Sequence, residues 1–297
     1  MTKTSKTVVF FGTEEYSQPA LQQLIEAGYN IAAVITKPDN KRGRGHKILP
    51  PPIKVLAQKN NIPVWQPEKI ADINDKIKAL NQPVVGVLVG FGKIIPQSTI
   101  DLFFPGIINV HPSLLPLYRG ASPIESAITN GDMTTGVSIM KIVQKMDAGP
   151  IYDQLKVCLS GQETRPELYN TLFNLGAKKL VQLLPSIIDQ QLQPLDQDDS
   201  KATFCKTFSK QDAWPDFAKF TADQAERIVR AHIGYPKTKT VIFDNEITIL
   251  KSHASDDRQS PLDIACQDGR FLSIDELIAP SGKTIKSNDF LNGYRIK

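Results

Sequence analysis

The most informative part of this chain is the stretch Ile108-Asn109-Val110-His111-Pro112-Ser113-Leu114-Leu115-Pro116, which turns from apolar to polar within a few residues. The first residues of this stretch have the pattern of the last residues of a strand. Because successive side chains of a strand alternate between its two faces, Asn109 and His111 are expected to project to the same side. An amide donor and a titratable base are therefore predicted to lie together where a strand ends.

A carboxylate follows at Met146-Asp147-Ala148-Gly149-Pro150, just after the apolar run from Val137 to Ile142. An amide, an imidazole and a carboxylate at strand ends are the groups that an acyl-transfer site combines. Each residue also has an ordinary interpretation. Asn109 can cap a turn, His111 can be a hydrogen-bonded histidine of the core, and Asp147 can serve turn formation alone.

Apolar and helical patterns alternate along the first two thirds of the chain. Strands are expected at 7–11, 31–36, 63–65, 84–89, 107–110 and 137–142. Helices are expected at 17–27, 53–59, 73–80, 123–129 and from the capping box Thr164-x-x-Glu167 to about residue 184. This alternation indicates an α/β fold with a doubly wound, mostly parallel sheet. Ligands of such sheets bind beyond the carboxyl ends of the strands, where Asn109, His111 and Asp147 are expected.

The last third of the chain has a different pattern. Residues 189–201 are rich in Gln and Asp without periodicity, which is typical of a linker. A helix over 221–232 and short strands at 239–243, 246–251, 262–266 and 270–274 predict a smaller antiparallel, OB-like β-barrel. We therefore expect a catalytic domain over 1–188, a linker over 189–204 and a C-terminal OB-like domain over 205–297.

The composition is that of an ordinary globular protein, with 297 residues of which 41% are hydrophobic and 22% are charged. No apolar run approaches the ~18 residues of a membrane span, and the run after Met1 is too short for a secretory signal. The three cysteines, Cys158, Cys205 and Cys266, have neither zinc nor disulfide spacing. We expect a cytoplasmic protein without a metal.

The formal net charge of +4 is concentrated in one segment. Residues 37–47 alone carry a net +4, so the rest of the chain sums to zero. The segment is either a solvated charged loop or an arm that contacts phosphates, and charge alone does not decide between them. The candidate phosphate-contacting residues are Lys41, Arg42, Arg44 and Lys47.

At these residues the chain resembles the folate-dependent formyltransferases. That family carries Asn-x-His-x-Ser-Leu-Leu-Pro, then Arg-Gly, then Asp-x-Gly, which stand here from Asn109, at Arg119-Gly120 and at Asp147 to Gly149. The resemblance extends over nearly the whole chain. It includes Thr36-Lys37-Pro38-Asp39, Gly90-Phe91-Gly92-Lys93-Ile94-Ile95-Pro96 and Phe208-Ser209-Lys210. The chain departs from the pattern at Pro112, where some members have Gly, and at Ser122, where Ala is common.

The resemblance implies a Rossmann-like catalytic domain that transfers a formyl group from 10-formyltetrahydrofolate to the α-amine of methionyl initiator tRNA, in support of translation initiation. It implies direct transfer through a tetrahedral oxyanion. Asn109 would stabilise that charge and His111 would transfer protons. Asp147 would either orient the imidazole or bind a proton-carrying water, and the sequence leaves both roles open.

The resemblance also implies how the substrates are held. Ser113, Leu114, Leu115 and Pro116 match the segment that contacts folate. Phe91 and Ile95 match a pterin-pocket wall, although their composition fits core packing equally well. The basic segment matches an insertion that contacts tRNA, which favours the phosphate-contacting arm. We expect a monomer with no membrane partner.

Three other functions remain open from the sequence. A formyltransferase for a small amine, such as a sugar nucleotide or glycinamide ribonucleotide, needs the same site but neither the basic segment nor the barrel. A folate- or RNA-binding protein without catalysis needs no intact trio of Asn109, His111 and Asp147. A hydrolase that releases formate needs a position for water at that site.

Overall fold

The computed structural model describes residues 7–42, 47–80 and 82–294, without side chains at Lys41, Arg42 and Lys47. The chain divides into two compact units. The first comprises Met1–Ala121, Thr135–Val157 and Tyr169–Phe204, and the second comprises Ser122–Thr134, Cys158–Leu168 and Cys205–Lys297.

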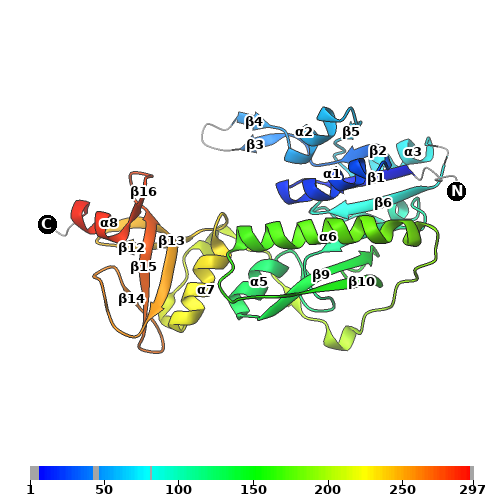
Figure 1. The fold of residues 1–297 in the computed structure, drawn as a ribbon. Coiled ribbons are helices and arrows are strands. Elements are labelled where there is room, and N and C mark those ends of the chain that lie inside the picture. The colour runs from blue at the N-terminus through cyan, green and yellow to red at the C-terminus, as the bar shows by residue number, and fades with distance from the viewer. Residues whose placement is uncertain (1–6, 43–46, 81, 295–297) are drawn as a thin grey trace. The chain divides into compact units, whose positions relative to one another are not determined.

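The first unit is built on a seven-stranded sheet (Figure 1). In spatial order its strands are β10 (Ile151–Cys158), β9 (Thr134–Lys141), β7 (Ile107–His111), β6 (Val84–Val89), β1 (Thr7–Gly12), β2 (Asn30–Ile35) and β5 (Val64–Trp65). Strands β5, β2, β1, β6 and β7 run parallel to one another, whereas β9 is antiparallel to β7. The predicted doubly wound, mostly parallel sheet is confirmed.

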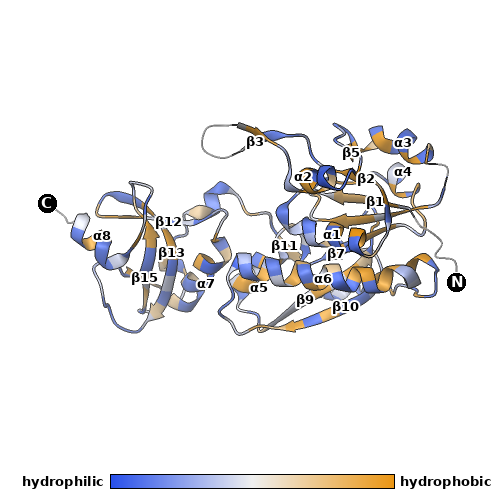
Figure 2. Cartoon of the chain, turned by 45° about the horizontal axis from the view of Figure 1, so that its top comes forward, coloured by the Kyte–Doolittle hydropathy of each residue, from blue (hydrophilic) through white to orange (hydrophobic). Residues whose placement is uncertain are grey.

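Helices and short strands complete this unit. They are α1 (Gln18–Glu26), α2 (Pro52–Lys59), α3 (Asn74–Lys78), α4 (Gln97–Ile100), most of α6 (Arg165–Ile188), the hairpin of β3 (Asn40–Arg42) and β4 (Lys47–Leu49), and the pair β8 (Arg119–Gly120) and β11 (Phe204–Cys205). The central strands are apolar on both faces, as parallel strands covered by helices must be. Figure 2 shows β1 and β2 in the hydrophobic colour, and every residue of β1 is buried.

Helix α6 covers the face of the sheet that carries Val110 and Val137. A side chain added at Gly176 of α6 would come within 2.5 Å of the Val110 side chain, so the glycine permits this close approach. The opposite face packs against an apolar cluster that includes Phe11, Phe91 and Ile107. Odd-numbered residues of β7 therefore face away from α6.

The second unit holds a five-stranded antiparallel sheet and its own core. Its elements are α5 (Pro123–Asn130), α7 (Ala222–His232), β12 (Thr238–Ile242), β13 (Asn245–Ser255), β14 (Ile264–Ala265), β15 (Phe271–Ile278), β16 (Thr284–Lys286) and α8 (Ser287–Gly293). The core gathers residues of α7, β13, β15 and α8, among them Val229, Ile249, Leu277 and Phe290. The predicted small antiparallel β fold is confirmed, and β16 and α8 are additions to it.

The segment from 189 to 204 contributes contacts to the first unit. Leu195 forms an isolated antiparallel bridge with Ile151, and a 3-10 turn covers Asp199–Lys201. Further 3-10 turns lie at Glu15–Ser17, Ile70–Ile73, Lys210–Ala213 and Phe217–Lys219.

Candidate active site

Strand β7 places Asn109 and His111 on one face of the sheet. Asn109 is paired with Met140 of β9 and His111 with Ser138, so the strand is regular through both residues. Both side chains are 5% exposed. Because alternate residues share a face, they lie on the side opposite α6, at the carboxyl end of a parallel strand.

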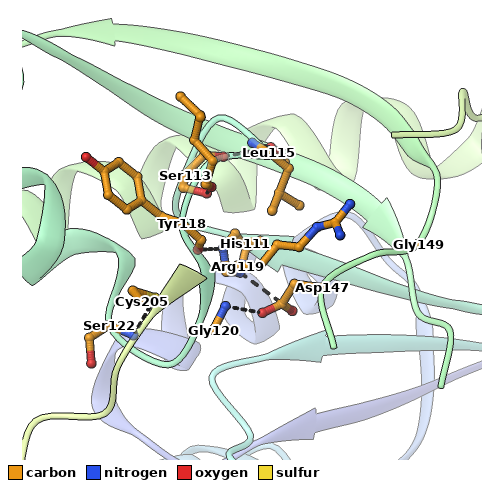
Figure 3. Close-up of polar contacts among 12 residues, drawn as sticks. His111, Ser113, Leu115, Tyr118, Arg119, Gly120, Ser122, Asp147, Gly149 and Cys205 are labelled. Carbon is orange, nitrogen blue, oxygen red and sulfur yellow. Dashed lines mark hydrogen bonds and ion pairs between the residues drawn. The ribbon is translucent and has the colours of Figure 1, made fainter. Parts of the chain in front are cut away.

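The imidazole of His111 has a polar neighbour at each of its nitrogens (Figure 3). Its Nε2 lies 3.0 Å from the carbonyl oxygen of Tyr118, and its Nδ1 lies 3.8 Å from Oδ1 of Asp147. A carbonyl oxygen only accepts hydrogen bonds, so Nε2 must carry the proton of the neutral ring. The lone pair at Nδ1 then faces Asp147, and this nitrogen is the one able to take up a proton.

Asp147 is held at its carboxylate by the chain after the Ser-Leu-Leu-Pro segment. Its Oδ2 accepts a hydrogen bond of 2.8 Å from the backbone N–H of Gly120. Asp147 has φ of 47°, a left-handed conformation that Asp adopts more readily than most residues. This carboxylate would face an imidazolium at His111, so Asp147 can stabilise the positive charge that the ring carries during proton transfer.

Asp147 lies near His111, but the prediction that the two residues meet because each follows the carboxyl end of its strand is wrong. Strand β9 is antiparallel to β7, with His111 opposite Ser138 and Ile108 opposite Lys141. The carboxyl end of β9 therefore points away from His111, and the loop after it must fold back to bring Asp147 there. Gly149 permits this return, since a Cβ at that residue would lie 1.8 Å from the carbonyl oxygen of Lys141.

The carboxamide of Asn109 is available for a ligand. Within the described residues its side chain makes no hydrogen bond, although the residue is buried. The amide N–H groups that the protein leaves unused can therefore donate to an acceptor on a bound molecule. The amide N–H is therefore a donor held ready for an oxygen atom that is not part of the protein.

The segment from Ser113 to Pro116 is fixed by two polar side chains. The Ser138 hydroxyl donates to the Ser113 carbonyl at 2.6 Å and accepts from the Leu115 N–H at 3.1 Å. The Gln154 amide donates to the Leu115 carbonyl at 2.8 Å. Leu114 lies over Gly136, where a Cβ would come within 2.5 Å of the leucine side chain.

Phe91 and Ile95 belong to the apolar core of the first unit. They are 1% and 4% exposed, and the ring of Phe91 packs edge-to-face on Phe11 at 5.4 Å between centroids. Both lie in the cluster that contains Ile107, the residue of β7 that shares a face with Asn109. Their packing supports the sheet beneath the candidate site.

The basic segment forms an antiparallel hairpin. Lys41 of β3 pairs with Ile48 of β4, and Arg42 pairs with Lys47, while Arg44 lies outside the described residues. At the base of the hairpin, Asp39 accepts hydrogen bonds from Lys54 at 2.8 Å and from Gln66 at 2.7 Å, which lower the pKa of its carboxyl group. These contacts connect the hairpin to α2.

The sequence did not reveal two residues beside the trio. Gln197 and Asp199 both contact the buried side chain of Arg119, and Gln197 also contacts the loop that carries Asp147. They come from the segment that was predicted to be a linker. No local pattern marks a contact between residues some 80 positions apart, so the sequence offered no signal for it.

Across the described ranges, no cluster of three or more His, Cys, Asp or Glu side chains is arranged to hold a metal ion. None of the helices in the part of the chain that the structure describes has the length and apolar content needed to cross a membrane.

The chain matches two known domain families. Residues 5–184 match the formyl transferase family, and residues 208–295 match its C-terminal domain. A methionyl-tRNA formyltransferase of a Sulfurihydrogenibium species is 36% identical, over 98% of this chain and 97% of that protein. Another, of a Geobacillus species, is 44% identical over 71% of this chain and 67% of that protein.

Solved structures share the fold. The N-formyltransferase of Helicobacter canadensis, in complex with folinic acid and dTDP-3-aminofucose, has a TM-score of 0.68 at 19% identity. The similarity covers 91% of this chain and 98% of that one. The domain matches and the full-length relatives, together with the Asn109, His111 and Asp147 motifs, lead to one conclusion: the chain belongs to the formyl transferase family.

Proposed function

We propose that this protein transfers a formyl group from 10-formyltetrahydrofolate to the α-amine of methionyl initiator tRNA and thereby supports translation initiation. The observation that carries the proposal is the geometry of His111, whose Nδ1 faces Asp147 while its Nε2 is bound to a carbonyl. The choice of acceptor follows the relatives, which are named methionyl-tRNA formyltransferase and match this chain almost end to end.

The proposed chemistry uses the trio in three roles. Asn109 donates to the oxygen of the formyl group as the amine attacks its carbon and negative charge develops there. His111 accepts, at Nδ1, the proton that the attacking nitrogen releases, and returns it to the folate nitrogen as the old C–N bond breaks. Asp147 stabilises the imidazolium between these two steps. No covalent bond to the protein is required.

The remaining site residues are assigned to binding. Ser113, Leu114, Leu115 and Pro116 would contact the folate, with Phe91 and Ile95 forming the apolar support behind it. Lys41, Arg42, Arg44 and Lys47 would contact phosphates of the tRNA, together with the C-terminal domain. We propose domain limits of 1–188, 189–204 and 205–297, and a monomer that acts in the cytoplasm.

An acceptor assay tests the function. The purified protein is incubated with formyl-labelled donor and, in parallel, with methionyl initiator tRNA, an aminosugar nucleotide or glycinamide ribonucleotide. The proposal expects label on the methionine of the tRNA and at most trace label on the small amines. Preferential labelling of a small amine would show that this amine, and not the tRNA, is the acceptor. Release of formate in every reaction would indicate a hydrolase.

A further inference from the structure

Arg119 is buried to 1% exposure, yet it carries a permanent charge. Its Nε and Nη2 donate to Oε1 of Gln197 at 3.0 and 2.8 Å, and Nη2 also contacts Oδ1 of Asp199 at 2.7 Å. The second oxygen of Asp199 accepts from Lys145. A buried guanidinium needs such acceptors, because an unpaired charge in the protein interior is costly.

Gln197 connects this guanidinium to the catalytic loop. Its amide nitrogen donates to the carbonyl oxygens of Asp147 at 2.8 Å and of Gly149 at 2.7 Å. The orientation of the amide is set by its neighbours, since Arg119 offers only donors and the two carbonyls only acceptors. One side chain therefore clamps the loop backbone on both sides of Ala148.

The residue after Arg119 completes the arrangement. The N–H of Gly120 donates to the carboxylate of Asp147, while Arg119 reaches the backbone of Asp147 through Gln197. The Arg119-Gly120 pair thus fixes both the side chain and the main chain of one residue. Asp147 needs such support, because its φ of 47° is uncommon for residues other than glycine.

We infer that Gln197, held by Arg119, is a positioning residue that sets the distance between Asp147 and His111. The inference rests on the proposed function for its kinetic consequences. Gln197 touches neither of the reacting groups, and it acts through the loop alone. The distance it controls is the 3.8 Å between His111 Nδ1 and Asp147 Oδ1.

Gln197→Glu tests the clamp with the least change in volume. The glutamate keeps an acceptor for Arg119 but turns a carboxylate oxygen toward the two carbonyls that the amide had bound. Since a displacement of about 1 Å at a reacting centre can cost roughly 100-fold, we expect kcat to fall between tenfold and that limit. The KM for the formyl donor should stay within about twofold. Gln193→Glu, the same change at an exposed residue of the same segment, should leave both constants unaltered.

A double-mutant cycle separates positioning from a general structural effect. In the background of Asp147→Ala, Gln197→Glu should cost less than about twofold in kcat, because the group it positions is gone. An equal loss of kcat in both backgrounds would overturn the inference. So would unchanged kcat for Gln197→Glu in an otherwise active protein.

An activity-independent measurement keeps the inference separate from the proposed function. The exchange of the Gly120 amide proton with solvent reports its hydrogen bond to Asp147. Gln197→Glu should accelerate this exchange at least tenfold, and Gln193→Glu should not. If the wild type formylated no acceptor, the proposed function would fall while this exchange still tested the clamp. Equal protection of Gly120 in both variants would refute the clamp.

Discussion

Nδ1 of His111 lies 3.8 Å from Oδ1 of Asp147, and the opposite ring nitrogen is bound to the carbonyl of Tyr118. The distance to the carboxylate is that of an ion pair and exceeds a direct hydrogen bond. Asp147 therefore acts on the charged form of the ring more than on the neutral one. The carbonyl of Tyr118, rather than the acid, sets which nitrogen holds the proton at rest.

The tautomer of His111 can be measured directly. Nitrogen NMR of the neutral His111 ring should show its proton on Nε2, because the Tyr118 carbonyl can only accept. Asp147→Asn should leave that tautomer unchanged, since the Tyr118 contact does not involve Asp147. A proton on Nδ1 in the neutral wild-type ring would contradict the proposed direction of proton transfer.

The basic hairpin should determine the salt dependence of tRNA use. Arg42→Ala should raise the KM for methionyl-tRNA. The slope of log KM against log salt concentration should decrease by roughly one, because one phosphate contact is lost. The KM for the formyl donor should not change. Lys78→Ala removes an exposed cation elsewhere in the same unit and is the matched control. Identical salt slopes in wild type and Arg42→Ala would exclude a phosphate contact at that residue.

The hydroxyl of Ser138 should be required for folate use. Ser138→Ala leaves the carbonyl of Ser113 and the N–H of Leu115 without this partner, at a cost of about 1–3 kcal/mol. We expect the KM for the formyl donor to rise severalfold while the KM for tRNA stays constant. Ser126→Ala removes a hydroxyl that also donates to a backbone carbonyl, and it serves as the control. Equal effects of the two variants would show that Ser138 only stabilises the fold.

His232 should make the second unit sensitive to acid. Burial lowers the pKa of His232 from 6.5 to about 4, with Asp212 opposing and Arg165 reinforcing the shift. The unfolded chain therefore binds a proton at a higher pH than the folded one, and stability falls as the pH drops from 6.5 toward 4. Between pH 7 and pH 5 the free energy of unfolding should lose about 2 kcal/mol through this group.

Urea unfolding at pH 7 and pH 5 measures that loss. His232→Gln should lose about 2 kcal/mol less than the wild type over this interval, because it has no group to protonate. A His232→Gln protein with the wild-type difference between the two pH values would disprove the assignment.

Local patterns predicted much of the fold. The apolar run over 84–89 coincides with β6. At the predicted capping box, the Glu167 carboxylate accepts from the N–H of Thr164 at 2.9 Å and from its hydroxyl at 2.7 Å. Both features depend on neighbours in sequence. The alternation of apolar and polar residues before Cys158 indicates a strand, and it coincides with the end of β10, where half-buried and exposed residues alternate after Tyr152.

Long-range features of the site could not be predicted from the sequence. The direction of β9 is not encoded in its apolar composition, so the fold-back of the loop to His111 was not foreseen. The contact of Gln197 with Arg119 joins residues 78 positions apart. No local sequence pattern predicts such a contact for a single glutamine in a polar segment. The motif residues were found because their chemistry is specific, whereas their supports are ordinary residue types.

The central claim is that Asn109 and His111 carry the chemical step. Single-turnover formylation of methionyl-tRNA, with donor and enzyme in excess, measures that step without product release. Asn109→Ala should slow it roughly 10²–10³-fold and His111→Ala roughly 10²–10⁴-fold, with both variants folded. His253→Ala removes a histidine that is also paired with an aspartate, and it should retain the wild-type rate. Near-normal rates in Asn109→Ala and His111→Ala would contradict the account.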